Sequence, residues 1–199
     1  MNKKALVLAT RNPDKAREIR DIFRRSGILI WSVSEFPQAP EVEETGETLK
    51  DNALLKARTI FGVLHLPVLA DDTGLEVRAL NNAPGVYSAR YAGEDATYAD
   101  NNRKLLHELR DVPPDERDAS FRCVAAFVAD GIEHTFEGVC TGTIGAEPRG
   151  WNGFGYDPLF VPMGFDKTFA QLDAETKNRL SHRAEAFRAM CDYLVKLDF

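Results

Sequence analysis

Two adjacent carboxylates, Asp71 and Asp72, are the side chains of this sequence whose placement most suggests chemistry. They follow the apolar run 68–70 in the segment PVLADDTGLEV, and a second apolar run begins after Gly74. Side chains alternate across a strand, so neighbouring acids cannot both face solvent within one flat strand. A polar turn between strands over 68–70 and 75–80 would explain the acids without chemistry. A metal site or a general base at the end of a buried strand would instead give the two acids a chemical role.

A second acidic segment, EVEETG, contains Glu43 and Glu44. Mg²⁺ prefers oxygen ligands and commonly takes one or two protein carboxylates together with substrate phosphates. A carboxylate beside such a metal could also deprotonate an attacking water. The same acids could equally form a solvated loop.

The segment TRNPDK, residues 10–15, follows the apolar run 5–9 and opens a helix expected over 13–25. A strand–loop–helix junction presents backbone N–H groups and the positive end of a helix, which suits phosphate. Thr10, Asn12 and Lys15 could add a hydroxyl, an amide and a cation. The Walker pattern GxxxxGK[ST] does not occur in the sequence. The alternative is a polar helix cap with a solvated lysine.

The glycine-rich segment GFGYDPLF, residues 153–160, could approach a ligand closely, and Phe154 or Tyr156 offers a flat face for a base. A tight turn with core aromatics is the alternative. His182 and Arg183 stand in the first turn of a helix expected to run from a Ser181 cap to about 197. Cations oppose the helix dipole there unless something anionic or acceptor-rich binds.

The remaining elements predict a mixed α/β sheet in one domain over residues 1–199. Strand and helix patterns alternate early in the chain, and a hairpin follows around Asp130-Gly131. The expected elements are strands over 5–9 and 28–33, helices starting at caps Thr48 and Thr97 and ending near 61 and 109, and loops over 35–47 and 81–97.

Composition limits the classes of partner. The net charge of −6 argues against binding to a nucleic-acid backbone, which needs a basic face. No apolar stretch is long enough to suggest a membrane span. Three dispersed cysteines without a CxxC pair are typical of a reducing compartment. We therefore expect a cytoplasmic protein that binds neither nucleic acid nor membrane.

Six segments, taken in order, resemble the RdgB family of inosine/xanthosine triphosphate pyrophosphatases. They are LATRNPDKAREI, EETGETLKDNALLKAR, ADDTGLEV, APGVYSARYAG, FGYDPLF and SHRAEAF, and they extend from about residue 6 to residue 188. The resemblance implies a mixed α/β fold with two lobes and a cleft. It also implies a homodimer that requires Mg²⁺ and hydrolyses ITP, dITP and XTP to the monophosphate and pyrophosphate.

The resemblance also implies roles for individual residues. Asp72 would be the catalytic base and a magnesium ligand, and Glu44 the second acidic ligand, with Glu43 as the alternative. Residues expected to bind the triphosphate or to contact substrate are Thr10, Arg11, Asn12, Pro13, Asp14, Lys15, Lys56 and Thr73. Residues expected to form the base pocket are Phe154, Gly155, Tyr156, Asp157, Lys177, His182 and Arg183.

Two positions depart from the family pattern. Many relatives have glycine where Arg11 stands and a small residue where Asp14 stands, so the details of phosphate binding stay open. Asp71 could be a second base, a ligand or a structural acid. Two rival functions are a pyrophosphatase for pyrimidine or modified nucleotides, like the septum-formation-inhibitor group, and a non-catalytic nucleotide sensor.

Overall fold

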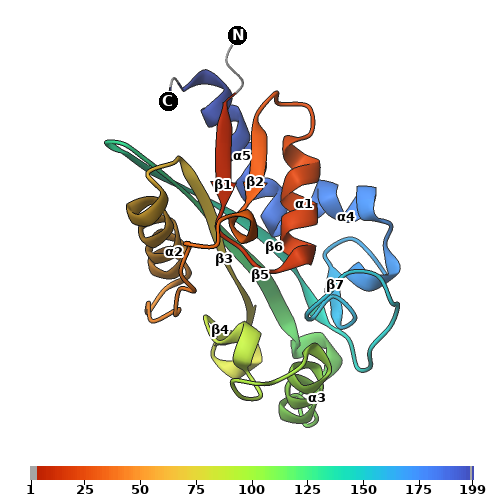
Figure 1. The fold of residues 1–199 in the computed structure, drawn as a ribbon. Coiled ribbons are helices and arrows are strands. Elements are labelled where there is room, and N and C mark those ends of the chain that lie inside the picture. Colours follow the sequence, from red (N-terminus) through yellow and green to blue (C-terminus); the bar gives the residue numbers. More distant parts are fainter. Residues whose placement is uncertain (1–3, 198) are drawn as a thin grey trace. The chain divides into compact units, whose positions relative to one another are not determined.

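The computed structural model describes residues 4–197 and 199, so residues 1–3 and 198 of the predicted 1–199 domain lie outside the described part. Its strands form one mixed sheet in the order β2-β1-β3-β5-β6-β7, with β4 paired to β3 (Figure 1). β1 is parallel to β2 and β3, whereas β4 is antiparallel to β3 and β7 to β6. The strands are β1 Ala5–Leu8, β2 Leu29–Ser32, β3 Val68–Val77, β4 Ala83–Gly85, β5 Asp118–Ala129, β6 Ile132–Ile144 and β7 Phe160–Pro162. The predicted mixed α/β sheet is confirmed.

The helices begin at polar caps. The predicted caps Thr48 and Thr97 accept hydrogen bonds from backbone N–H groups three residues on, and Asn12 caps the first helix with Pro13 at its first position. The helices are α1 Pro13–Phe23, α2 Leu49–Leu64, α3 Tyr98–Glu108, α4 Ala174–Leu180 and α5 His182–Lys196. Among the described residues, no helix combines the length and the apolar character needed to cross a bilayer.

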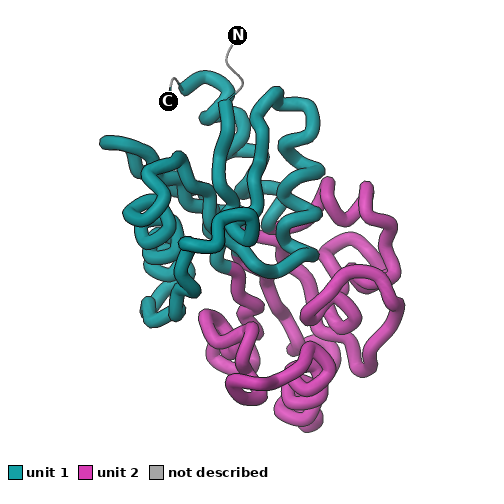
Figure 2. Tube along the Cα trace, in the orientation of Figure 1, with its two compact units in different colours: residues 1–72, 123–138, 183–199 teal, residues 73–122, 139–182 magenta. Residues whose placement is uncertain are grey.

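The chain folds into two compact units, coloured separately in Figure 2. The first unit contains residues 1–72, 123–138 and 183–199, and the second unit contains residues 73–122 and 139–182. The unit boundaries fall inside β3, β5 and β6 and after the first residue of α5. The two-lobed arrangement with a cleft and the single domain stay predictions.

The core of the first unit lies against α1 and α5. Leu6 and Leu8 of β1 and Leu69 of β3 share one buried cluster with apolar residues of both helices. Phe23 of α1 and Phe187 of α5 meet edge to face with ring centroids 6.4 Å apart. These contacts fix both helices on the side of the strands to which Leu69 points.

The core of the second unit is built around three aromatic rings. Phe121 of β5 lies 4.7 Å from Phe160 of β7 and 6.0 Å from Phe169, measured between ring centroids. Leu75 of β3 and Leu105 of α3 belong to the same buried cluster.

The expectation of two separate strands with the acids between them is wrong, and so is the alternative of a polar turn at Asp71–Gly74. β3 runs without a break from Val68 to Val77, and residues 78–80, expected to be strand, form a 3-10 helix. The short strand β4 lies within the expected loop over 81–97 and pairs with β3. Gly74 permits this pairing, because a Cβ atom there would stand 2.6 Å from the carbonyl oxygen of Gly85. The glycine that suggested a turn is instead a point of close strand contact.

We expect Phe187→Ala to lower the free energy of unfolding by about 3–5 kcal/mol, because it empties a fully buried ring site. Urea denaturation followed by circular dichroism measures the change. Val195→Ala on the exposed side of the same helix is the control, with an expected change below about 0.5 kcal/mol. Equal losses in the two variants would contradict the assigned core.

Candidate functional site

Asp71 and Asp72 lie in the middle of β3, and the alternation of the strand sends their side chains to opposite faces. Their residues are 1% and 4% exposed. Asp71 shares a face with Leu69, on the side of α1 and α5, whereas Asp72 contacts α2. The two acids therefore have different neighbours although they are adjacent in the chain.

Asp72 meets two polar side chains of α2. Asn52 donates through Nδ2 to Asp72 Oδ2 at 3.2 Å, and Lys56 Nζ lies 3.3 Å from Asp72 Oδ1. Lys56 Nζ also lies 2.6 Å from Glu44 Oε1. Asn52 and Lys56 are four residues apart, which places them on one face of the helix. We call Glu44, Lys56 and Asp72 the carboxylate–lysine cluster.

The electrostatics of this cluster favour a carboxylate that can take up a proton. Burial raises the pKa of Asp72 above its ordinary value; Lys56 and Lys15 oppose this rise, and the nearby charges of Glu44 and Asp71 add to it. Burial alone would lower the pKa of Lys56, but Asp72, Glu44 and Asp71 outweigh it and raise that pKa, so the lysine stays charged. Asp72 thus has the character expected of a general base.

Asp71 belongs to a buried ion-pair network of Lys15, Glu18, Asp71 and Arg183. Lys15 Nζ lies 3.0 Å from Asp71 Oδ2, and Arg183 reaches the same oxygen at 3.4 Å. Arg183 also donates to Glu18 Oε2 at 2.8 Å. Burial acts to raise the pKa of Asp71, but Lys15, Arg183 and Lys56 outweigh it and hold that pKa below its usual value. Asp71 is therefore a carboxylate that stays charged at neutral pH and pairs with two cations.

This network bears on two residues that were predicted to bind substrate, Lys15 and Arg183. The guanidinium of Arg183 is buried between Asp71 and Glu18 in the first unit, and the ammonium of Lys15 is paired with Asp71. Both side chains are held by carboxylates of the protein itself.

The rest of the segment 10–15 forms the start of α1. Asn12 Oδ1 accepts hydrogen bonds from the N–H groups of Asp14 and Lys15, as a helix cap does. Arg11 donates to the carbonyl of Ala39 at 3.0 Å. Asp14 pairs with Arg17 at 2.6 Å. The two residues that depart from the family pattern thus make contacts within the protein.

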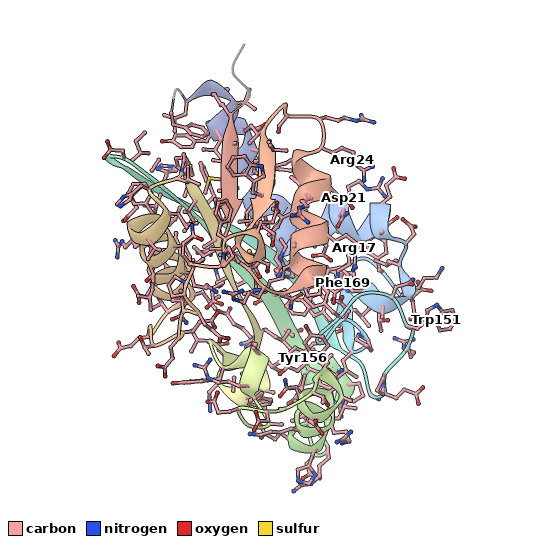
Figure 3. The ribbon with its side chains drawn as sticks, viewed as in Figure 1. Arg17, Asp21, Arg24, Trp151, Tyr156 and Phe169 are labelled. Carbon is pink, nitrogen blue, oxygen red and sulfur yellow. The ribbon has the colours of Figure 1, made fainter. Side chains whose placement is uncertain are left out.

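A cavity of about 480 Å³ adjoins this segment in the first unit. Thr10, Arg11, Asn12 and Pro13 line one part of it, and polar residues along α1 line another. Figure 3 labels Arg17 and Asp21 of α1 and Arg24, which directly follows the helix; all three line the cavity. Lys15 and Asp71 do not line this cavity.

In the second unit, the predicted base-pocket segment forms a loop over residues 154–157, which we call the aromatic loop. Phe154 N–H donates to Asp157 Oδ2 at 2.8 Å, and Lys177 donates to the same oxygen. The Lys177 ammonium lies 4.9 Å from the centre of the Phe154 ring. Gly153 leaves room for this arrangement, because a Cβ atom there would clash with the Asp157 carboxylate at 2.1 Å.

The two rings of the aromatic loop differ in exposure. Tyr156, labelled in Figure 3, is buried in the core and donates through its hydroxyl to the carbonyl of Ser88 at 3.0 Å. Phe154 is half-buried. The structure therefore makes Phe154 the more accessible flat face.

His182 and Thr73 complete the predicted set. The ring of His182 is buried and stacks on Phe121, with centroids 4.6 Å apart and planes inclined by 13°. Thr73 follows Asp72 on β3 and is half-buried.

Sequence reasoning missed Asn52 and Glu18. Asn52 stands four residues before Lys56, a spacing that could have suggested a shared helix face. Nothing local to Glu18 indicates that its partner would be Arg183, which lies 165 residues later.

The donor set of the carboxylate–lysine cluster suits a magnesium ion. Glu44 and Asp72 both lie within contact distance of one cation, the Lys56 ammonium, and both present oxygen. Glu43 is exposed, which favours Glu44 over its neighbour. Within residues 4–197 and 199, no group of three or more His, Cys, Asp or Glu side chains gathers as a metal cage. A magnesium ion shared with substrate phosphates commonly takes one or two protein carboxylates, so Glu44 and Asp72 could hold it.

Comparisons with known proteins agree on one family. A model described as the Ham1 family matches residues 6–193. Curated relatives named dITP/XTP pyrophosphatase include one from Geobacter sulfurreducens, 49% identical over 95% of this chain and 96% of its own. Another, from Thermoanaerobacter pseudethanolicus, is 46% identical over 96% of each chain.

Solved structures give the same result. A HAM1 protein from Coxiella burnetii has a TM-score of 0.89 and 42% identity over 98% of this chain and 100% of its own. The Staphylococcus aureus Ham1 protein has a TM-score of 0.86 and 41% identity over 96% of this chain and 98% of its own. The family resemblance expected from the motifs is confirmed.

We expect Asp71→Asn to lower the free energy of unfolding of the metal-free protein at pH 7 by about 3 kcal/mol, because Arg183 and Lys15 lose their buried counter-charge. The folded-state pKa of Asp71 is depressed, so its contribution is present above the ordinary aspartate pKa and is lost as the pH falls below about 4. Urea titrations at several pH values measure the difference between wild type and variant.

The difference between wild type and Asp71→Asn should shrink as the pH is lowered. Asp21→Asn is the control, because Asp21 pairs with Arg24 at the surface and its loss should cost less than about 1 kcal/mol. A pH-independent difference for Asp71→Asn would show that the carboxylate charge is not what stabilises the fold.

Proposed function

Because the chain belongs to the Ham1 family, we propose that it hydrolyses non-standard purine nucleoside triphosphates, namely ITP, dITP and XTP, to the monophosphate and pyrophosphate. Relatives that cover almost the whole chain have the name dITP/XTP pyrophosphatase. The enzyme would remove these nucleotides from the cellular pool.

The observation that supports this chemistry most directly is the environment of Asp72. It is a buried carboxylate with a raised pKa, held by Asn52 and Lys56 beside a second carboxylate, Glu44. A protein that only sensed nucleotides would have no need of a carboxylate poised to accept a proton.

We assign the proton transfer to Asp72. Its carboxylate takes a proton from the attacking water as the new bond to the α-phosphorus forms. The bond between the α-phosphorus and the bridging oxygen breaks, and pyrophosphate leaves with the bonding electrons. Lys15 and Lys56 supply positive charge near the developing negative charge. Mg²⁺ bound by Glu44 and Asp72 would neutralise phosphate charge and orient the triphosphate.

The residues of segment 10–15, together with Lys56 and Thr73, are the proposed triphosphate contacts. The N-terminal end of α1 supports this assignment, since the positive end of a helix dipole favours phosphate. The proposal is compatible with Asn12 as a helix cap, because its side chain fixes the geometry of the turn.

Base recognition falls to the aromatic loop with Lys177, His182 and Arg183. A side chain that donates a hydrogen bond accepts a purine with a 6-oxo group, whereas a 6-amino group would set donor against donor. Phe154 would provide the stacking face.

Partners and location follow from the same assignment. We propose a homodimer that acts in the cytoplasm on a purine nucleoside triphosphate and binds neither nucleic acid nor membrane. Cys123, Cys140 and Cys191 form no disulfide among the described residues, which is compatible with a reducing compartment. The highly exposed Trp151 and Met163 offer apolar surface for a subunit contact.

Product identification tests the reaction class. The protein is mixed with Mg²⁺ and a panel of purine and pyrimidine triphosphates, and the products are separated by anion-exchange chromatography. Inosine or xanthosine monophosphate with pyrophosphate supports the proposal. Orthophosphate with a diphosphate would reject it. A pyrimidine preference would favour the septum-formation-inhibitor-like alternative, and binding without turnover would indicate a sensor.

We expect Asp72→Asn to lower kcat for ITP by at least about 100-fold, because the amide cannot accept the proton from water. Pyrophosphate release measured with a coupled assay gives the rate, and circular dichroism checks the fold. Asp118→Asn, at an exposed position on β5, is the matched control and should retain wild-type turnover. Near-normal turnover of folded Asp72→Asn would remove Asp72 from the proton-transfer step.

We expect His182→Ala to reduce the preference for ITP over ATP by about tenfold, because a donor to the 6-oxo group and the support of the Phe121 stack are both lost. The ratio of kcat/KM values for the two nucleotides measures the preference. His65→Ala, on a residue with no assigned role, is the control. An unchanged ratio would place recognition of the 6-position elsewhere.

A further inference from the structure

One face of α3 contacts the aromatic loop within the second unit. Tyr98 and Asn102 are four residues apart and so share that face. The Tyr98 ring lies 6.1 Å from the Phe154 ring, measured between centroids and inclined by 43°. Asn102 donates through Nδ2 to the carbonyl oxygen of Gly155 at 3.1 Å.

The burial of Asn102 is hard to explain by stability alone. The residue is 8% exposed, and within the described part of the chain its Oδ1 atom has no hydrogen-bond partner. A buried acceptor without a partner destabilises a fold. An apolar residue of similar size would avoid that cost, so what distinguishes asparagine here is its bond to Gly155.

The neighbouring Asn101 has a different role. Its Nδ2 donates to the carbonyl of Ala89 at 3.0 Å, and its Oδ1 accepts from the N–H of Ala92 at 2.8 Å. Both ends of this buried amide are satisfied by a segment outside the aromatic loop. Asn101 is therefore explained by structure and serves as a matched reference.

The bond from Asn102 fixes the plane of the peptide between Gly155 and Tyr156, because a peptide group is rigid. The Tyr156 hydroxyl and the Asp157 carboxylate hold the loop at two further points. With these anchors in place, the Phe154 ring lies near Tyr98 on α3 and near Lys177 on α4. The orientation of the ring thus depends on α3 as well as on the loop itself.

We infer that Asn102 is a positioning residue for purine selectivity: by holding the Gly155 carbonyl, and with Tyr98 packed beside Phe154, it fixes the flat face against which the base is selected. This inference rests on the proposed pyrophosphatase function. Asn102 acts through the loop and does not itself contact the base.

The test is Asn102→Leu, which keeps the branched shape and the number of side-chain heavy atoms, removes the donor and also removes the unpartnered acceptor. Purified wild type and variant are assayed with ITP and ATP in Mg²⁺, and their thermal unfolding is recorded. We expect KM for ITP to rise about tenfold with kcat changed by less than about twofold, and the ITP-to-ATP ratio of kcat/KM to fall about fivefold. Thermal stability should stay equal to wild type or increase.

Asn101→Ala provides the opposite signature. Two satisfied hydrogen bonds are lost, so the melting temperature should fall while the ITP-to-ATP ratio stays at the wild-type value. If folded Asn102→Leu keeps that ratio within about twofold, or loses stability and kcat together as Asn101→Ala does, the inference is overturned.

A second pair of variants covers the case in which Asn102→Leu does not fold. Tyr98→Ala, at a partly exposed position, should raise KM for ITP about fivefold, and Tyr98→Phe, which keeps the ring, should restore it. An equal KM in both variants would remove α3 from the selection of the base. Wild type that forms no pyrophosphate from ITP would instead refute the proposed function, and with it this inference.

Discussion

The alternation of side chains along β3 is the constraint on which the chemistry of the first unit depends. It turns two neighbouring carboxylates to opposite faces, where almost equal burial has opposite consequences. Asp71 meets two cations, Lys15 and Arg183, whose combined charge outweighs the cost of burial and lowers its pKa. At Asp72 the charges of Lys56 and Lys15 are offset by those of Glu44 and Asp71, so burial prevails and its pKa rises. The balance of charges around each side chain thus lowers the pKa of one acid and raises that of its neighbour.

That division requires helices to deliver cations at fixed points. Lys56 reaches Asp72 from one face of α2, whose start is set by its Thr48 cap. Lys15 reaches Asp71 from the first turn of α1, which Asn12 caps. Within each helix, the face on which a lysine lies follows from its position in the sequence. Moving either lysine by one residue along its helix would turn it by about 100° away from its carboxylate.

The sequence predicted the starts of α1, α2, α3 and α5 and the mixed sheet because capping residues and apolar periodicity are local signals. It did not predict the short helix α4. It did not predict that Asp71 and Asp72 lie inside a strand. Acids followed by Thr-Gly have the composition of a turn, and local preference cannot include a counter-charge such as Arg183, which lies 112 residues away. Gly74 suggested a turn for the same reason: the contact that requires a glycine there is with β4, which local sequence does not reveal. The candidate site was recognised from the order of its motifs, whereas its electrostatic division could come only from tertiary contacts.

At the start of α5, the expected partner of Arg183 was a bound ligand, but the structure shows carboxylates of the protein itself. Cations in a first helical turn are unfavourable unless an anion or an acceptor is near, which led us to expect a ligand at His182 and Arg183. The anions beside Arg183 are carboxylates of the protein, Glu18 and Asp71, and the buried face beside His182 is the ring of Phe121. Arg183 is consequently held rigidly before any nucleotide arrives. Under the proposed function, a donor fixed in this way would lose little conformational entropy on binding, so it would discriminate between an oxo and an amino group more sharply than a mobile surface arginine.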